Sequence, residues 1–209
     1  MKAHTLETQT TMTPEKALDF LKEGNDRFQR NLKANRNLLE QVNDTKEGQF
    51  PFATILSCID SRVSAELVFD QGLGDIFSIR IAGNFVNEDI LGSMEFASKL
   101  AGTKLIVVLG HTACGAIKGA CDHARLGNLT ALINKIEPAV DMVLEPQDES
   151  LRNSQNNEFV DAVAAKNVQI TIDNIYQRSD VLREMEENGE IRIVGGMYDL
   201  ATGAVNFFE

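Results

Sequence analysis

The sequence predicts an α/β fold in which a central, mainly parallel β-sheet is flanked by helices. Three short apolar runs bounded by glycine or polar residues are typical of buried strands, and they lie at 52–59, 75–83 and 104–110. Segments with helical spacing of apolar residues separate these runs, at roughly 63–71 and 88–102. Strands that alternate with helices in this way favour right-handed crossovers and a sheet covered on both faces.

A single domain accounts for the whole length. The chain has 209 residues, of which 43% are hydrophobic and 24% charged, which suits one packed core. No internal repeat or low-complexity tract divides it. We expect a flexible amino terminus over 1–12 and one α/β domain over 13–209, whose first part, 13–45, is a helical arm.

The arm opens with a strong helix-start signal. Thr13 is a typical N-cap, Pro14 suits the first helical position, and Glu15 suits the positively polarised first turn. Leu18 and Leu21 then fall on one face of this helix. We expect the arm to pack on its own domain or on a second subunit.

The second half of the chain is mostly helical in period. Helix-like segments follow one another from residue 115 to Gly189. The closing stretch, 191–208, reads as two strands around the turn-prone residues 201–203.

Charge and cysteine content exclude several classes of protein. A formal net charge of −11 argues against nucleic acid as a partner, because phosphate binding needs clustered Lys and Arg. No segment reaches the ~18 uninterrupted apolar residues of a membrane span, and the first 18 residues contain no apolar core of signal-peptide length. The three cysteines form no even disulfide framework. We therefore expect a cytoplasmic protein without a membrane partner.

Three polar side chains follow the first predicted strand at every second position. If the extended conformation continues, Cys58, Asp60 and Arg62 share one face, at the strand end where ligands bind in open α/β sheets. Each residue also has a structural interpretation. Buried cysteine behaves as a small hydrophobe, and Asp with a nearby Arg is common at a helix cap.

A second pair of ligand-type residues follows the third predicted strand. His111 and Cys114 lie three positions apart on a turn flanked by glycines. Together with Cys58 they supply two thiols and one imidazole, a set that suits tetrahedral zinc, and three protein ligands indicate a catalytic rather than a structural site.

Competing interpretations of these residues are weaker. Gly110 to Gly115 has the spacing of a phosphate-binding loop, but Ala116 stands where the lysine belongs. A cysteine nucleophile working with His111 leaves the second thiol unexplained. Cys121 or His123 would make the site structural as a fourth ligand, but two residues so close on a helix point in different directions.

The joint pattern Cys58-x-Asp60-x-Arg62 and His111-x-x-Cys114 resembles the β-class carbonic anhydrases. The segments PEKALDFLKEGNDRF, DIFSIRIAGN and GHTACGAIKGA are also similar to that family, so the resemblance runs from about residue 13 to the carboxyl terminus. It implies a zinc-binding carbonic anhydrase domain that forms a homodimer or homotetramer.

The resemblance also implies a reaction and a role for each residue. One Zn²⁺ per subunit, held by Cys58, His111 and Cys114, would carry a hydroxide that attacks carbon dioxide and yields bicarbonate and a proton, the reaction of a carbonate dehydratase, a lyase. Asp60 would accept a hydrogen bond from that hydroxide, and Arg62 would hold Asp60. In some relatives the same Asp ligates the metal and closes the site.

Four further residues match the substrate site of the family. Gln49, nine positions before Cys58, matches a glutamine of the plant-like, open-site subgroup, and the absence of Trp agrees with that subgroup. Phe77 and Phe96 match aromatics that line the substrate pocket, often across a dimer interface, although Tyr is common in place of Phe96. Gly115 completes this set.

Two other functions stay open from the sequence. A hydrolase of carbon disulfide or carbonyl sulfide would share the same zinc site. A zinc-stabilised interaction protein without catalytic activity would need a closed metal shell.

Overall fold

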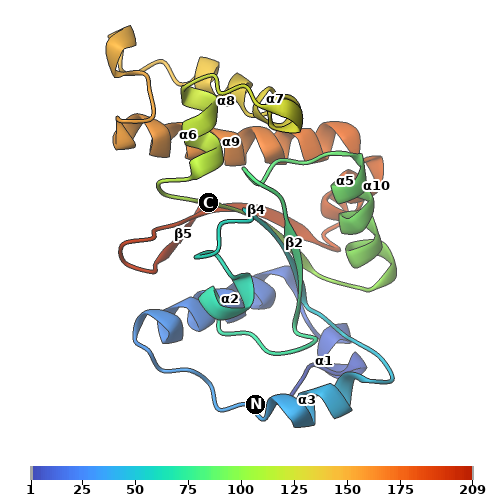
Figure 1. The fold of residues 1–209 in the computed structure, drawn as a ribbon. Coiled ribbons are helices and arrows are strands. Elements are labelled where there is room, and N and C mark those ends of the chain that lie inside the picture. The colour runs from blue at the N-terminus through green and yellow to red at the C-terminus, as the bar shows by residue number, and fades with distance from the viewer. Residues whose placement is uncertain (1, 209) are drawn as a thin grey trace.

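A five-stranded sheet forms the centre of the computed structural model, which describes residues 2–208 (Figure 1). The strand order is β2-β1-β3-β4-β5. The strands are β1 (Ala53–Ser57), β2 (Ile76–Arg80), β3 (Leu105–His111), β4 (Arg192–Tyr198) and β5 (Val205–Phe207). The first four are parallel to one another, and β5 is antiparallel to β4. The predicted α/β class with a mainly parallel sheet is confirmed.

Helices precede, separate and follow the strands of this sheet. They are α1 (Leu6–Thr10), α2 (Pro14–Gln29), α3 (Leu38–Thr45), α4 (Ala65–Val68), α5 (Glu88–Glu95), the π-helical turn η1 (Phe96–Leu100), α6 (Gly115–Cys121), α7 (Gly127–Ile133), α8 (Glu137–Met142), the 3-10 turn η2 (Glu149–Leu151), α9 (Asn157–Arg178) and α10 (Asp180–Glu187). The predicted N-cap of α2 is confirmed, because the Thr13 side chain accepts from the Lys16 amide. Among residues 2–208, no helix has both the length and the apolar character needed to cross a membrane.

Two helical layers cover the two faces of the sheet (Figure 1). Helix α2 packs on one face, where its Leu21 meets Ile55 of β1 and Val107 of β3 in one core cluster. Helices α5, α9 and α10 cover the other face around Leu56 and Val108. Alternate residues of β1 and β3 therefore face opposite layers, as the strand period requires.

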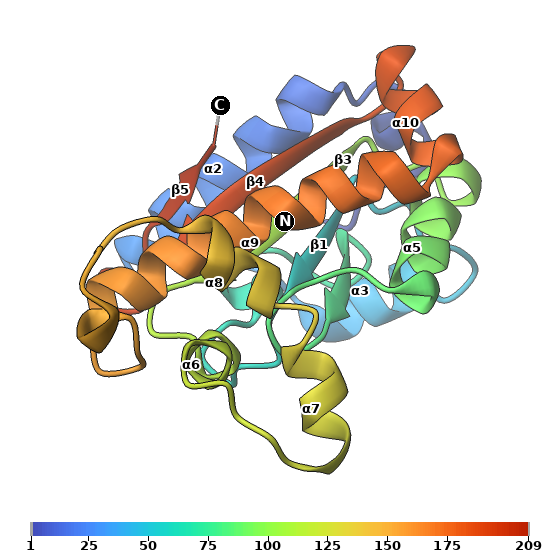
Figure 2. The ribbon, with the colours of Figure 1, turned by 90° about the horizontal axis from the view of Figure 1, so that it is seen from above.

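Helix α9 lies nearly along the length of β4 (Figure 2). Gly110 of β3 permits this close approach, because a Cβ there would stand 2.7 Å from both Val168 of α9 and Met197 of β4. The helix is therefore seated directly on β4 and on β3, the strand that leads to the turn with His111 and Cys114.

Strand β2 differs from the buried strand that we expected. Its residues are half-buried or exposed rather than buried, because β2 is an edge strand that pairs with β1 on one side. The apolar residues of 75–83 therefore lie in a strand at the edge of the sheet and not in an internal strand.

The amino-terminal segment contains a short helix. We expected flexibility over residues 1–12, where α1 lies. The side-chain nitrogen Nε2 of Gln9 anchors this helix, because it donates to the carbonyl oxygens of Pro51 at 2.7 Å and Ala101 at 2.8 Å. Flexibility of this segment in solution stays a prediction.

Candidate metal centre

Three buried side chains meet where β1 and β3 end. Cys58 follows the last residue of β1, His111 is the last residue of β3, and Cys114 is the N-cap of α6. Their ligand atoms all lie within 4.8 Å of one another. The structure thus brings together the three residues that the sequence analysis selected, from two neighbouring parallel strands.

The geometry of this cluster fits a zinc ion. The two sulfurs are 3.9 Å apart, close to the roughly 3.8 Å that separates two thiolates in a tetrahedron with Zn–S bonds of about 2.3 Å. His111 Nδ1 lies 3.0 Å from the Thr112 carbonyl oxygen, a contact that requires the proton on Nδ1. His111 Nε2 then carries the lone pair, and it is buried without a hydrogen-bond partner among residues 2–208.

The cluster also favours negative charge. The pKa of Cys58 is lowered to about 4, first by the contact with Cys114 and further by the Gly83 amide. The pKa of Cys114 is raised by the same contact and by burial. One proton shared by two close sulfurs leaves a buried thiolate, which a divalent cation can stabilise.

Backbone and arginine contacts hold the Cys58 segment in place. The Gly83 amide donates to Cys58 Sγ at 3.4 Å. Arg80, at the end of β2, donates to the carbonyl oxygens of Cys58 at 3.0 Å and Asp60 at 2.7 Å. Our sequence reasoning missed Arg80, although an arginine at the end of the neighbouring strand was the available signal.

Asp60 and Arg62 pair in a turn and not along a strand. Strand β1 ends at Ser57, so the extended conformation that we assumed through Arg62 is wrong. Instead, Asp60 Oδ1 accepts from the Arg62 backbone amide at 3.0 Å, which bends the chain as an Asx-turn. The Arg62 guanidinium also donates two hydrogen bonds to Asp60, from Nε to Oδ1 at 2.9 Å and from Nη2 to Oδ2 at 2.7 Å.

This bidentate pair fixes the charge of Asp60. Hydrogen bonds from the Arg62 side chain hold the pKa of Asp60 well below its usual range, with a smaller contribution from the Arg62 amide. The carboxylate is therefore ionised at neutral pH, and each of its oxygens is engaged by Arg62.

The turn that carries the other two ligand residues is fixed from two sides. Thr112 N donates to the Tyr198 carbonyl oxygen at 3.0 Å, and the Leu200 amide donates to Thr112 Oγ1 at 3.0 Å. The next residue, Ala113, has a φ of 52°, and its amide donates to Asp161 Oδ1 of α9 at 2.8 Å. Asp161 was also missed, because a residue distant in sequence gives no local signal.

The two candidate fourth ligands lie outside the cluster. Among residues 2–208, the group able to hold a metal consists of Cys58, His111 and Cys114. Cys121 is buried at the end of α6, and exposed His123 contacts Glu137 Oε1 at 3.0 Å. These positions favour a three-residue ligand set.

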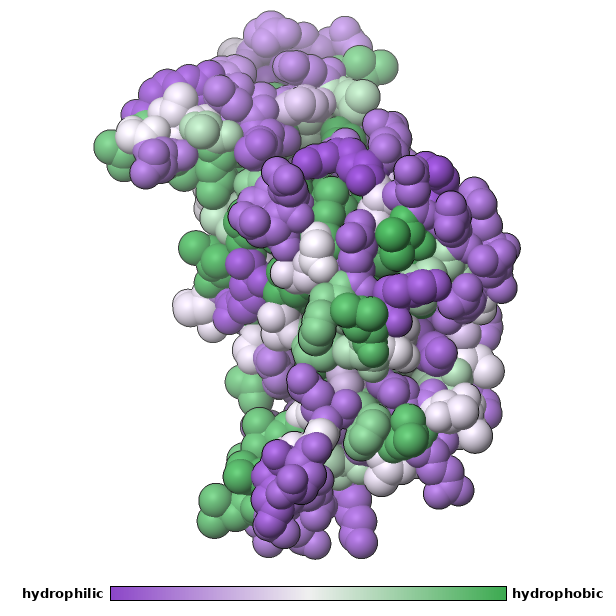
Figure 3. Space-filling model, turned by 90° about the vertical axis from the view of Figure 1, so that its right-hand side faces the viewer, coloured by the Kyte–Doolittle hydropathy of each residue, from purple (hydrophilic) through white to green (hydrophobic). Residues whose placement is uncertain are grey.

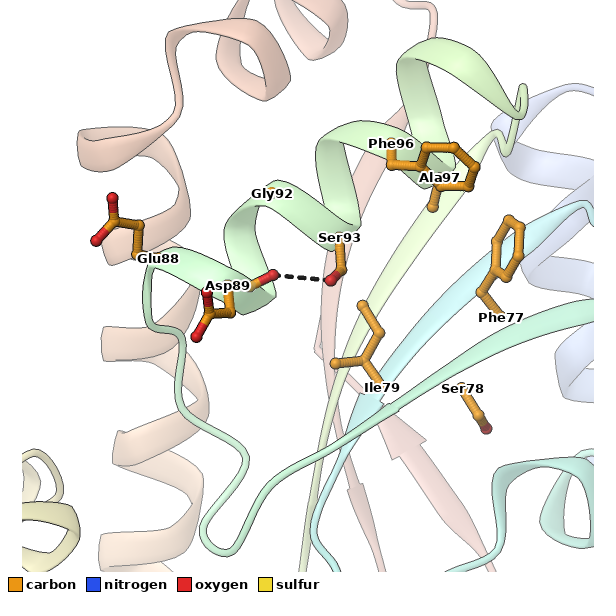
Figure 4. A pocket seen from close by; sticks show the side chains of 9 residues that line it. All are labelled: Phe77, Ser78, Ile79, Glu88, Asp89, Gly92, Ser93, Phe96 and Ala97. Atoms are coloured by element: carbon orange, nitrogen blue, oxygen red, sulfur yellow. Dashed lines mark hydrogen bonds between the residues drawn. The ribbon is translucent and has the colours of Figure 1, made fainter.

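Three of the four expected substrate residues lie far from the cluster in the same chain. Phe77 is in register with Thr54, four positions before Cys58, which corresponds to about 13 Å along a strand. Phe96 faces Phe77 from η1 with ring centroids 6.4 Å apart (Figure 4). Exposed Gln49 lines a separate hollow beside α3.

Phe77 and Phe96 line a surface groove of about 680 Å³ between β2 and α5. Gly115, in contrast, adjoins Cys114, and a Cβ on it would meet nothing within 4 Å. One chain therefore supplies the metal cluster and open space beside it, but not the aromatic wall.

Comparisons with known proteins show which family the chain is similar to. Residues 53–205 match a family model described as carbonic anhydrase. Carbonic anhydrase 2 of Mycobacterium tuberculosis is 35% identical over 196 residues, which cover 91% of this chain and 90% of that protein.

Solved structures share the fold. The structure of the β-carbonic anhydrase CcaA has a TM-score of 0.72 at 26% identity, covering 92% of this chain and 95% of that one. A structure from a study of two tetrameric β-carbonic anhydrases of the ascomycete Sordaria macrospora has a TM-score of 0.67 at 23% identity, covering 78% and 83%. The range matched by the family model, 53–205, contains Cys58, His111 and Cys114.

Proposed function

The chain belongs to the β-class of the carbonic anhydrase family, and from that premise we propose that Cys58, His111 and Cys114 form the centre at which it interconverts carbon dioxide and bicarbonate. The observation that carries the proposal is the buried set of two sulfurs and one imidazole nitrogen within 4.8 Å, the nitrogen having no hydrogen-bond partner among residues 2–208. Zinc held by these residues supplies the Lewis acid that makes water nucleophilic near neutral pH.

Asp60 and Arg62 orient the reacting groups in this proposal. An ionised Asp60 accepts a hydrogen bond from the attacking water species and so directs its lone pair toward carbon dioxide. Arg62 keeps the carboxylate in this role through its bidentate contact. Because Arg62 engages both oxygens, the arrangement supports the open-site subgroup, in which Asp60 does not ligate the metal.

We infer that the substrate site is completed by a second copy of the chain. Gln49, Phe77 and Phe96 lie on the β2 side of the molecule, and among residues 2–208 β2 pairs with another strand along one edge only. A homodimer joined there would place the aromatic groove of one subunit near the metal cluster of the other. The Sordaria macrospora proteins, described as tetrameric, support a homodimer or homotetramer.

Two further points follow for partners and location. The relatives compared above are carbonic anhydrases by name, so they lend no support to a hydrolase of carbon disulfide or carbonyl sulfide. Location in the cytoplasm is supported by three free cysteines, which suit a reducing compartment.

The decisive experiment is stopped-flow hydration of carbon dioxide by the zinc-loaded protein across pH, with metal content measured on the same sample. We expect one zinc per subunit and an activity that rises with pH. A matched Cys58→Ser variant should lose zinc and activity together, since it removes one sulfur of the set.

Two outcomes would contradict the proposal. One is full carbon dioxide hydration in Cys58→Ser protein that contains no metal. The other is zinc-loaded wild-type protein without hydration activity at any pH.

A further inference from the structure

Ala113 occupies an unfavourable backbone conformation directly before a metal-cluster residue. Its φ of 52° lies in the left-handed region, which residues with a Cβ avoid. The turn from His111 to Cys114 must nevertheless adopt it, so that the imidazole and the thiol reach one point. Something outside the turn has to stabilise this conformation.

The stabilising contact comes from helix α9. Asp161 Oδ1 accepts the Ala113 amide at 2.8 Å, and Asp161 is half-buried in the first turns of this long helix. A hydrogen bond to a carboxylate is stronger than one between neutral groups, so it is well suited to holding a strained peptide.

Helix α9 is itself fixed relative to the other half of the cluster. Buried Asn167, six residues after Asp161, donates to the Gly83 carbonyl oxygen at 2.8 Å. The Gly83 amide in turn donates to Cys58 Sγ. Apolar residues of α9 such as Val160 belong to the same core cluster as Cys58 and Cys114. The helix therefore contacts both ligand-bearing segments.

We propose that Asp161 is a positioning residue of the metal centre, which holds the Ala113 turn in the conformation that presents His111 and Cys114 to one ion. The inference rests on the proposed function, because it assumes that these residues bind zinc. Asp161 acts through the Ala113 amide and does not itself touch the metal or the substrate.

Zinc affinity, measured by competition with a chromophoric chelator, tests this role. Asp161→Ala should bind zinc about tenfold more weakly, as is typical when a partner of a ligand-bearing group is lost. Asp161→Asn keeps Oδ1 as an acceptor and should stay within about threefold of wild type. Glu158→Ala removes an exposed carboxylate from the same helix turn and should leave zinc affinity unchanged.

A second substitution tests whether backbone strain is the cause. Glycine adopts a positive φ without penalty, so Ala113→Gly in the Asp161→Ala background should recover much of the lost affinity. The visible absorption of the Co²⁺-loaded proteins gives an independent readout of ligand geometry. We expect a changed spectrum for Asp161→Ala and a spectrum close to wild type for the double variant.

The outcomes separate the inference from the function on which it rests. Zinc affinity and a cobalt spectrum equal to wild type in Asp161→Ala would overturn the positioning role, as would an equal loss in Asp161→Asn. If Asp161→Ala does not fold, Asp161→Glu, which displaces the acceptor by one methylene, must bind zinc more weakly than Asp161→Asn. Wild-type protein that takes up no metal would instead overturn the proposed function.

Discussion

At the scale of single residues, Arg62 controls what Asp60 can do. With Arg62 in place, both Asp60 oxygens are occupied by the guanidinium, and the carboxylate stays ionised. Without it, Asp60 is free to turn toward the cation. We predict that Arg62→Ala lowers kcat/KM for carbon dioxide hydration by about 10- to 100-fold while zinc content stays near one per subunit.

Arg62→Lys is the matched control for charge. Lysine keeps the positive charge but cannot form the bidentate contact, so its activity should lie between those of wild type and Arg62→Ala. Unchanged hydration by Arg62→Ala protein would remove Arg62 from the mechanism.

His4, in the amino-terminal segment, makes the stability of the protein depend on pH. The centroid of its ring lies 5.0 Å from that of Phe52 and 5.9 Å from that of Phe20. Burial lowers the pKa of His4 from its ordinary value of 6.5, and nearby Asp75 opposes this effect. Around and below pH 6.5 the unfolded chain therefore binds the His4 proton more readily than the folded protein does. The free energy of unfolding consequently decreases as the pH is lowered.

We accordingly predict a difference between wild type and His4→Gln. From neutral pH down through 6.5, the wild-type free energy of unfolding should decrease more steeply than that of the variant, since glutamine does not titrate. Urea unfolding at several pH values measures both slopes. Parallel slopes would show that His4 does not contribute.

At the scale of elements, the sequence identifies strands and helices better than the turns between them. The runs at 52–59 and 104–110 became β1 and β3 because a continuous apolar segment has few alternatives inside a parallel sheet. The Asx-turn at Asp60 and the left-handed Ala113 were not predicted. The Ala113 conformation depends on Asp161, which lies far along the chain, and no local pattern encodes that contact. The Asx-turn is local to Asp60 and Arg62, but we expected the strand to continue through both residues.

Gly83 shows how one loop serves the metal centre. Its φ is 79°, and a Cβ there would stand 2.4 Å from Ile136 Cδ1. We predict that Gly83→Ala destabilises the protein by about 2–4 kcal/mol, combining backbone strain with overpacking. Because the Gly83 amide donates to Cys58, zinc affinity should fall as well.

Urea unfolding and chelator competition measure these two effects. Gly92→Ala provides the control, since it lies within helix α5 and a Cβ on it meets nothing within 4 Å. That variant should be as stable as wild type or slightly more stable. Equal stability of Gly83→Ala and wild type would contradict the strain argument.

At the scale of the whole molecule, the sequence alone does not locate the surface where two copies of the chain meet. Gln49, Phe77 and Phe96 were expected at the substrate site, yet in one chain they lie at the far end of β1 from Cys58. On the side of the molecule that carries α5, hydrophobic side chains form small clusters among hydrophilic ones (Figure 3). The resemblance implies a homo-oligomer, but the interface depends on the surfaces of both copies, so no local pattern in one chain locates it.

The open edge of β2 offers a direct test of that assembly. Ile81 N donates to the Ser57 carbonyl oxygen, so Ile81 and Ile79 direct their backbone groups toward β1. Ser78 has the opposite parity, and its amide faces the unpaired edge. Proline at this exposed position removes an outward donor and leaves the pairing with β1 intact.

We therefore predict that Ser78→Pro lowers the oligomeric state without loss of zinc. Sedimentation analysis should show a smaller assembly than wild type, because backbone pairing along this edge is blocked. If a second copy completes the substrate site, carbon dioxide hydration should fall at least tenfold in the same sample. Ser78→Thr keeps the amide and should behave as wild type. A Ser78→Pro protein that stays assembled would place the interface elsewhere, and a fully active monomer would show that one chain suffices.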